Sequence, residues 1–422
     1  MKHSSIAFKY PTYRDDSPKS CKRWLDGKRI DDNAEGLWRV HDKLYDLRLF
    51  MKNHPGGKDW LEMTKGVDIT ELFEIHHITD SAEKILPKFY VRDASSPRNY
   101  KITFEENGFY KTMKRRLASK LESLDESQVS NSRFYCDFML TSTILFSVIA
   151  ARDNNYLIAS LAALSLSWLV IITHNFIHQK DNWRMYLMNL SLLNYRDWRV
   201  FHVMSHHHYP NSYHDLEISF FEPFLNWMPE KKTKTQIYFY WAVSPIVYAS
   251  TLFSGFIMRM SSAIFHNQQL FADDLMPLLL PTTMYIFGNI NIYVVVKIWL
   301  FIVMLSSFFY MLVAINAGHH HREIFHEGDE LKSLDFGVYQ LAATIDKVEV
   351  KNSLFLTLTT FGQHILHHFF PSLDHSLLPQ LTEMFYETCQ EFENEFREFP
   401  WWELIKGQYI QLARTETTKL SN

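Results

Sequence analysis

The chain has 422 residues, and its 43 Lys and Arg against 47 Asp and Glu give a net charge of −4. Such a balance excludes a nucleic-acid-binding protein, which would carry a strong basic excess, and a hydrophobic content of 47% excludes a disordered or fibrous chain. Histidine is abundant, at 21 residues, whereas the 3 cysteines are too few for a disulfide scaffold or a four-cysteine zinc site and fit a reducing compartment.

The first 133 residues are polar and divide into three parts. Residues 1–20 form a polar tail without the apolar stretch of a cleavable signal peptide. Residues 21–95 have the character of a small soluble domain. Residues 96–133 are charged and contain an amphipathic pattern, which predicts either a solvated linker or a helix on a membrane surface.

A histidine motif in residues 21–95 indicates a haem site. The string His54-Pro55-Gly56-Gly57 follows the pattern WxxxDxxYDL, which starts at Trp38, and a histidine pair, His76-His77, comes 22 residues after it in an acidic segment. Together these features resemble the haem-binding domain of cytochrome b5 over residues 37–91. The resemblance implies an α+β fold that binds haem b.

The same resemblance implies how the haem is held. Its axial ligands would be His54 and His77, with His76 as the alternative to His77. Gly56 and Gly57, after Pro55, would let the backbone turn tightly beneath the porphyrin. Because both axial positions of the iron are filled, such a haem passes electrons and does not bind O2.

Apolar runs dominate the chain between residues 134 and 400. A helix of about 18 residues is about 27 Å long, close to the ~30 Å hydrocarbon core of a bilayer. These runs could be buried helices of a soluble protein. Several runs joined by tight polar turns instead favour an all-α polytopic membrane domain over residues 134–400. Residues 401–422 are predicted to form a C-terminal tail. The runs are Phe134–Ala151, Tyr156–Thr173, Ile237–Met258, Leu275–Gly288 and Asn291–Ile315.

Histidines recur in three boxes beside these runs. Spacings of three and four residues place imidazoles on one helical face, and adjacent histidines point about 100° apart, so that a pair can reach two neighbouring metals. Polar patches or a zinc site would not need so many imidazoles, whereas an all-imidazole set suits a redox-active metal, with iron the best candidate. The candidate ligands are His174 and His178, then His202, His206 and His207, and finally His364, His367 and His368.

Three boxes in this order resemble the integral-membrane fatty acid desaturase and hydroxylase superfamily over residues 134–400. The resemblance implies a non-haem di-iron centre. An Asn-x-x-x-His element of acyl-CoA desaturases maps onto Asn316 and His320, with His319 and His321 as alternatives to His320. In the second box, His208 is a further alternative.

Two further resemblances bear on the substrate. A haem domain placed before the boxes resembles front-end desaturases, but those begin the third box with Gln, where this chain has His364. The segment from Trp24 to Asp32 instead resembles the insect cytochrome b5-related family. The position of the double bond and the substrate are therefore left open.

The boxes constrain the topology, because histidines of one metal site must face one side of the membrane. Two runs separate the haem domain from the first box, so both are expected on the cytosolic side. Three runs separate the second box from His320, so one of them must not span. Ile237–Met258 contains Pro245 and is expected to lie at the interface or to be re-entrant, which leaves four transmembrane helices plus an interfacial segment.

The resemblances together predict a membrane-bound, O2-dependent fatty acyl desaturase. Removing two hydrogens from an acyl chain supplies two electrons, whereas reducing O2 to water takes four, so the fused haem would deliver the rest. The resemblances also imply a fatty acyl lipid or acyl-CoA substrate, NADH-dependent cytochrome b5 reductase as partner, and the endoplasmic reticulum membrane. A lipid hydroxylase, or a non-catalytic electron-transfer or regulatory membrane protein, are the alternatives.

Overall fold

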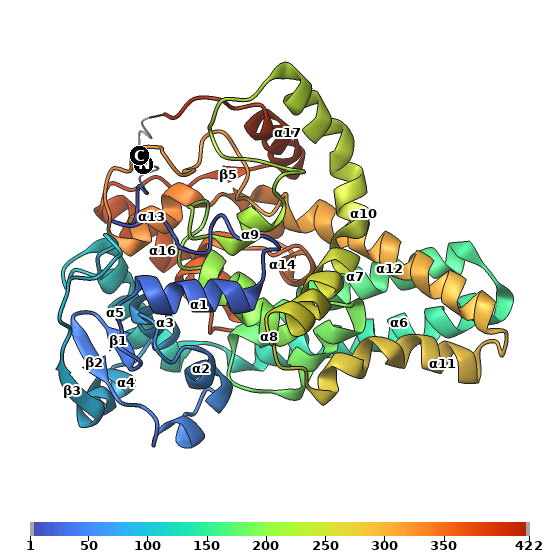
Figure 1. The fold of residues 1–422 in the computed structure, drawn as a ribbon, viewed down its shortest axis with the longest axis horizontal. Coiled ribbons are helices and arrows are strands. Elements are labelled where there is room, and N and C mark those ends of the chain that lie inside the picture. Colours follow the sequence, from blue (N-terminus) through green and yellow to red (C-terminus); the bar gives the residue numbers. More distant parts are fainter. Residues whose placement is uncertain (1–3, 419–422) are drawn as a thin grey trace.

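The computed structural model describes residues 4–418 and places a small α+β domain beside a larger helical domain (Figure 1). The small domain has an antiparallel sheet in the order β1-β2-β3. Trp38, Tyr45 and Phe73 belong to its buried core. Its strands are β1 (Trp38–Val40), β2 (Lys43–Tyr45) and β3 (Tyr90–Asp93), and its helices are α2 (Lys58–Met63), α3 (Thr70–His76) and α4 (Ser81–Ile85).

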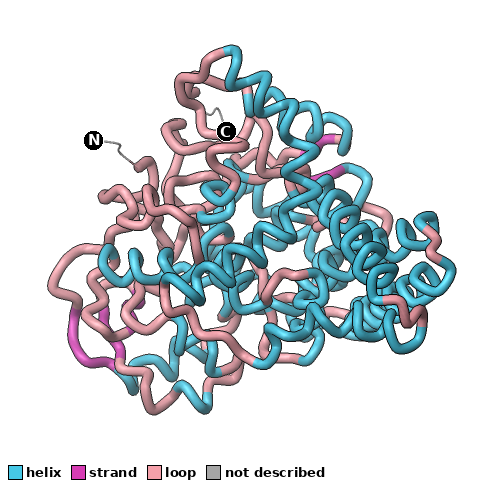
Figure 2. Tube along the Cα trace, turned by 45° about the vertical axis from the view of Figure 1, so that its right-hand side comes forward, coloured by secondary structure: helices cyan, strands magenta, loops and turns pink. Residues whose placement is uncertain are grey.

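The larger domain is built almost entirely of helices, which Figure 2 shows in cyan. Its two short strands, β4 (Asp346–Lys347) and β5 (Glu398–Phe399), pair in parallel. Its helices are α5 (Phe109–Lys120), α6 (Val129–Asp153), α7 (Tyr156–His178), α8 (Tyr195–Trp198), α9 (Leu216–Phe220), α10 (Lys234–Phe265), α11 (Leu279–Phe287), α12 (Ile292–Ala314), α13 (Phe336–Ala343), α14 (Leu354–Thr359), α15 (His364–Phe369), α16 (Thr382–Glu391) and α17 (Trp401–Leu412).

Long apolar helices contain four of the five apolar runs. Within residues 4–418, four helices are long and apolar enough to cross a bilayer, namely Glu126–Asp153, Tyr156–His178, Lys234–Phe265 and Ile292–Ala314. The turn between the first two is made by Asn154, which is left-handed at the end of α6, and by Asn155, whose side chain caps α7. The predicted fold class, an α+β domain followed by an all-α polytopic membrane domain, is confirmed.

Length and composition include α10 among these helices, but α10 runs across the others (Figure 1). Near its start, Trp241 donates a hydrogen bond to the backbone of Tyr409 in α17. Near its end, Arg259 pairs with Asp197 and Asp274. Both ends of α10 therefore contact elements on the side of the bundle that carries the histidine boxes, as expected for an interfacial helix.

The segment that contains α11, unlike α10, runs from the histidine side of the bundle to its opposite end. It begins with a 3-10 helix, Ala272–Leu278, whose Asp273 contacts Asn189 close to the first box. After α11, Asn289 contacts the backbone of Ala151 at the α6–α7 turn. Seven residues at about 2.0 Å each and nine at about 1.5 Å each give about 27 Å, enough to cross the hydrocarbon core. This geometry agrees with the hairpin predicted from the sequence.

The segments predicted as tails and as a linker are packed against the two domains. In the N-terminal segment Ile6 and Tyr13 are buried, and α1 (Cys21–Asp31) follows it. Helix α5 buries Phe109, Met113 and Leu117 and packs on α13 and α16, which does not fit a solvated linker. The alternative, a helix on a membrane surface, stays a prediction. The C-terminal segment forms α17, which packs on α10.

Candidate haem cavity and metal centre

A cavity of about 530 Å³ lies beside α2, α3 and α4 of the small domain. Its wall is mainly apolar and includes Phe50, Leu72 and Phe89. His54 and His77 both line it, with ring centroids 6.2 Å apart. Two imidazoles at this separation inside an apolar slot suit a flat, apolar group with a metal at its centre.

The ring nitrogens of both histidines are oriented for a metal between them. His54 Nδ1 donates a hydrogen bond to the carbonyl oxygen of Gly57 over 2.9 Å, and His77 Nδ1 donates one to Phe73 over 2.9 Å. These bonds leave each Nε2 with a free lone pair. Burial lowers the pKa of His77 to about 4, so its imidazole is neutral at pH 7. The residues fit a haem with two histidine ligands.

His76, the alternative to His77, lies in a different environment. Its Nδ1 donates a hydrogen bond to the carbonyl oxygen of Leu72 over 3.1 Å, and its ring packs against Trp60 with centroids 5.7 Å apart. Its Nε2 is buried without a hydrogen-bond partner. The structure therefore pairs His54 with His77 and places His76 against a tryptophan.

The glycine turn also serves the contact between the domains. Gly57 has φ +116°, and a Cβ there would collide with the carboxylate of Asp181 in the larger domain. The backbone N–H of Asp181 donates to the carbonyl oxygen of Gly56 over 3.0 Å. Arg199 pairs with Asp181 at 2.9 Å and lies 4.2 Å from the ring of Trp60. Pro55 of the same motif lines the haem cavity. The motif therefore contacts both the cavity and the larger domain, which carries the histidine boxes.

The haem cavity is bordered by residues of the larger domain. His178, Gln179 and Lys180, from the end of α7 and the loop after it, form part of its wall. His178 belongs to the first histidine box, so one side chain adjoins both the cavity and the candidate metal centre.

Five imidazoles converge in the first of two all-histidine groups found among residues 4–418. Their ligand nitrogens all lie within 4.8 Å of one another. The Nε2 atom of His174 lies 2.7 Å from that of His202 and 3.0 Å from that of His178. A shared proton satisfies one pair of nitrogens but not five, whereas ligands with bonds of about 2.0–2.1 Å to one metal lie about 3 Å apart. This group, called cluster one, consists of His174, His178, His202, His207 and His367.

A local irregularity assembles the second box. Residues Arg199–His206 form a π-helix, in which the backbone N–H of His207 bonds to the carbonyl oxygen of His202. Residues five apart lie on one face of a π-helix, so His202 and His207 both point into cluster one, with Nε2 atoms 3.0 Å apart. His206 points to the second group instead.

The second group, called cluster two, consists of His206, His319, His364 and His368. The Nε2 atom of His319 lies 2.6 Å from that of His364 and 3.0 Å from that of His368. His319 Nδ1 donates to the carbonyl oxygen of Ala343. Both clusters are buried and contain imidazoles alone, a donor set that fits two neighbouring metals of the borderline class.

One of the predicted histidine ligands lies outside the clusters. His320, the choice made from the sequence, stacks on Trp227 with centroids 4.1 Å apart, and its neighbour His319 takes its place. Asn316 donates from its Nδ2 to the carbonyl oxygen of Leu312, and its Oδ1, the atom that would bind a metal, is buried without a hydrogen-bond partner. Since three consecutive side chains point in different directions, only the tertiary structure selects among them.

Carboxylates contact the far nitrogens of the second box. His202 Nδ1 lies 2.9 Å from Glu217, and His206 Nδ1 lies 2.9 Å from Asp215. Burial lowers the pKa of His206, but the two carboxylates outweigh burial and raise it to about 9. Such contacts fix the ring orientation of metal ligands. Sequence reasoning missed both acids, although they follow the second box within ten residues.

Neutral groups hold the third box. His368 Nδ1 donates to Gln340 Oε1 over 2.9 Å, and His367 Nδ1 lies 3.0 Å from His375 Nε2. His375 is buried, and its ring contacts the cluster-one histidine His367. Gln340 lies 28 residues before His368, so no local motif indicates it, whereas His375 follows His367 by eight residues.

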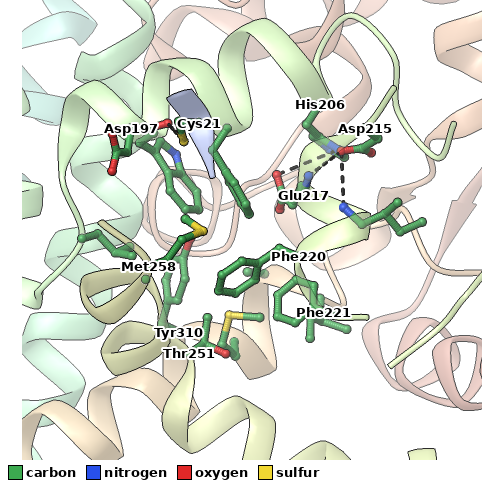
Figure 3. A pocket seen from close by; sticks show the side chains of 18 of the residues that line it. Cys21, Asp197, His206, Asp215, Glu217, Phe220, Phe221, Thr251, Met258 and Tyr310 are labelled. Carbon is green, nitrogen blue, oxygen red and sulfur yellow. Dashed lines mark hydrogen bonds and ion pairs between the residues drawn. The ribbon is translucent and has the colours of Figure 1, made fainter. Parts of the chain in front are cut away.

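A narrow apolar pocket leads to cluster two. Figure 3 shows Phe220, Phe221, Met258 and Tyr310 around it, with His206 at one side. The pocket lies between α10 and α12, and His206 and His319 form part of its wall. An unbranched apolar chain is the kind of molecule that such a lining accepts.

Two family models match consecutive parts of this chain. The model described as a cytochrome b5-like haem/steroid binding domain matches residues 27–95. The model described as fatty acid desaturase matches residues 155–400. The first match contains the haem cavity motif, and the second contains every histidine of the two clusters.

Curated proteins match over nearly the whole length. The chain is 43% identical over 420 residues to the cytochrome b5-related protein of Drosophila melanogaster, which covers 98% of this chain and 96% of that protein. It is 24% identical over 419 residues to a probable Delta(5) fatty acid desaturase C of Dictyostelium discoideum, covering 89% and 90%. An acyl-lipid (8-3)-desaturase of Mortierella alpina is 24% identical over 209 residues, covering 44% and 46%. No solved structure matches the chain.

Proposed function

The chain belongs to the fatty acid desaturase family and carries a cytochrome b5-like domain ahead of the desaturase domain, and from this premise we propose that it is a membrane-bound, O2-dependent fatty acyl desaturase. His54 and His77 would hold haem b, and clusters one and two would hold a non-haem di-iron centre. When bound, the haem supplies single electrons and the iron pair supplies the chemistry that activates O2.

The observation that carries this proposal is the position of the two clusters between two cavities. His178 of cluster one lines the haem cavity, and His206 and His319 of cluster two line the apolar pocket. An electron carrier on one side and an alkyl chain on the other is the arrangement that an oxidative reaction on a lipid needs.

The residues around the clusters keep the imidazoles in place and the site dry. The members of both clusters are buried. Glu217, Asp215 and Gln340 hold Nδ1 atoms, so the Nε2 atoms face inward. Phe220 and Phe221 close the pocket around the chain and exclude water.

Localisation and partners follow from the same proposal. The haem domain and both clusters lie at one end of the helix bundle, which we assign to the cytosolic face of the endoplasmic reticulum membrane. There the haem can receive electrons from NADH-dependent cytochrome b5 reductase. O2 and a fatty acyl lipid or acyl-CoA are the substrates.

Lipid profiling of cells with and without the full chain tests the function. A desaturase produces acyl chains with one additional double bond at unchanged chain length. An additional hydroxyl group in place of the double bond would indicate a lipid hydroxylase on the same site. Unchanged lipids, in cells where the purified chain contains its haem, would contradict the proposal and favour a non-catalytic electron-transfer protein.

A further inference from the structure

Helix α1 lies between the haem domain and the larger domain (Figure 1). On one side, the Arg29 guanidinium donates hydrogen bonds to the backbone carbonyl oxygens of Met63 and Lys65 in the haem domain. On the other side, Trp24 Nε1 donates over 3.0 Å to the carbonyl oxygen of His214, in the loop after the second histidine box. The helix therefore contacts both domains at once.

Apolar side chains of the haem domain also enter the core of the larger domain. Trp60 and Ile75 are 7% and 0% exposed and belong to the buried cluster that forms the core of the larger domain. The haem domain's own core is a separate cluster. Separation of the two domains would expose Trp60 and Ile75 to water, so burial of these side chains stabilises the contact.

Charged side chains are buried at the same place. Lys28 Nζ lies 2.9 Å from a carboxylate oxygen of Asp32, which also accepts a hydrogen bond from the backbone N–H of Asp68. Arg98 pairs with Asp68 at 2.8 Å and with Glu71 at 2.6 Å. Apart from Arg98, each of these residues is exposed by 3% or less. The group, called here the buried charge cluster, consists of Lys28, Asp32, Asp68, Glu71 and Arg98.

Two tyrosines connect the buried charge cluster to the second histidine box. Lys28 Nζ donates to the hydroxyl of Tyr100 over 2.6 Å, and the ring of Tyr100 stacks on that of Tyr209 with centroids 4.5 Å apart. The hydroxyl of Tyr209 donates to Glu71 over 3.3 Å. Because Tyr209 directly follows His208 in the chain, the buried charge cluster joins the haem domain to the segment that carries the second box.

Helix α3 connects the same cluster to the haem site. Glu71 lies in its first turn, and His77 follows its last residue. Toward the end of the helix, Glu74 is 2% exposed and pairs with Lys111 and Lys114 of α5 at 2.9 and 3.0 Å. The larger domain and the buried charge cluster thus hold α3 near both ends, which fixes the orientation of His77 relative to the histidine clusters.

Buried charges of this kind select one arrangement of the two domains. In a different arrangement Lys28 or Glu71 would lose its partners, and a buried charge without a partner is strongly unfavourable. Domains joined by a small polar contact are expected to move relative to each other. Here a matched set of buried charges is combined with an apolar contact, which favours a single docked position.

We propose that the haem domain passes its electrons from this docked position, without leaving the larger domain, and that Lys28 is the positioning residue that selects the position. The proposal rests on the proposed function. Each transfer would oxidise the haem iron from ferrous to ferric and reduce the two-metal centre by one electron. Two transfers supply the two electrons that the acyl chain does not provide. Fixed docking keeps donor and acceptor at one distance and orientation.

Distance measurements between spin labels test the docking without relying on activity. Labels are attached through Lys88→Cys in the haem domain and Glu387→Cys on α16, both at exposed positions, in the full-length protein in nanodiscs. The native cysteines are buried and should not react. Double electron–electron resonance should give one narrow distance distribution. A broad distribution, or two separate distances, would overturn the proposal.

Lys28→Met is the variant that should release the haem domain. It leaves three buried carboxylates opposite Arg98 alone, and separation of the domains returns them to water. We expect a broadened distance distribution with unchanged haem spectrum and iron content. Reoxidation of the reduced haem by O2, followed by stopped-flow absorbance, should slow about tenfold as the docked fraction falls. Lys22→Met is the matched control, because Lys22 pairs with Asp26 within α1 at 2.5 Å, and should change neither measurement.

A milder variant keeps the test decisive if Lys28→Met does not fold. Asp59 of the haem domain pairs with Arg196 of the larger domain, and both side chains are less than one-fifth exposed. Asp59→Asn removes this charge at constant size, so it should broaden the distance distribution and slow haem reoxidation by about threefold. An unchanged distribution in the folded variants would overturn the positioning role of these charges.

The outcomes separate this proposal from the proposed function. A broad distance distribution in the wild type, together with normal oxidised product, would overturn fixed docking and leave the desaturase intact. A narrow distribution without oxidised product, and with haem reoxidation no faster than in His368→Ala, would support the docked position and contradict the proposed function.

Discussion

The haem cavity and the histidine clusters are assembled in opposite ways. Both proposed haem ligands come from one short stretch, between His54 and His77, within a single small domain. The clusters combine histidines from α7, the π-helix, the loop after α12 and α15, which are spread over residues 174–368. A cofactor site whose ligands lie close together in sequence can be read from a motif, whereas the clusters require the complete membrane domain.

The strongest test of this contrast is His368→Ala. We expect complete loss of oxidised product, because removing one ligand opens a site whose members act as a unit, and further cluster substitutions should then add little. Haem absorbance should be unchanged. Product analysis and haem spectra of the same preparation measure both effects, with His266→Ala, outside the clusters, as control. Full activity of His368→Ala would disprove the role of cluster two.

A pair of neighbouring substitutions sharpens the assignment of cluster two. His319→Ala should lower non-haem iron and abolish product, since His319 lies in the cluster. His320→Ala should keep the iron, because His320 stacks on Trp227. Measuring the non-haem iron of both variants shows whether His319 or His320 is the ligand. Loss of iron in His320→Ala alone would reinstate the ligand chosen from the sequence.

The converse test removes the haem. His54→Ala should abolish the low-spin haem spectrum and leave the non-haem iron in place. Product formation should fall about tenfold or more, because a diffusing electron donor replaces a tethered one at much lower effective concentration. Spectra, iron content and product are measured together. If His54→Ala also lost non-haem iron, the two sites would not be independent.

The smallest effect is expected from Glu217→Gln, which removes a carboxylate in contact with His202 but no metal ligand. Metal affinity should fall about tenfold, the lower end of what such supporting contacts contribute. Titration with a chelator compares the variant with the wild type. An unchanged titration curve would mean that Glu217 does not support the cluster.

The sequence predicted the features that depend on residues close together in the chain. The resemblances to cytochrome b5 and to membrane desaturases are both confirmed, because the HPGG motif and the boxes are short patterns. That Ile237–Met258 does not span stays a prediction: α10, which contains this run, is long and apolar enough to cross a bilayer, whereas its two ends contact elements on the histidine side. Helix length alone would have favoured α10 over the shorter α11.

The features that the sequence did not predict depend on tertiary contacts. His319 and His320 are neighbours with identical side chains, and only their surroundings, His364 or Trp227, distinguish them. The N-terminal segment looked like a polar tail, yet Ile6 and Tyr13 are buried. No pattern in a single sequence shows which distant surface will cover such a segment.

The central claim is that one chain contains an electron-transfer haem and a separate two-metal centre. Quantification of iron and haem in the purified full-length protein, with Mössbauer spectroscopy of the iron, tests it most directly. We predict about three irons per chain, one in a low-spin haem and two in a non-haem pair. One iron per chain, all of it in haem, in a preparation with intact clusters would contradict the claim.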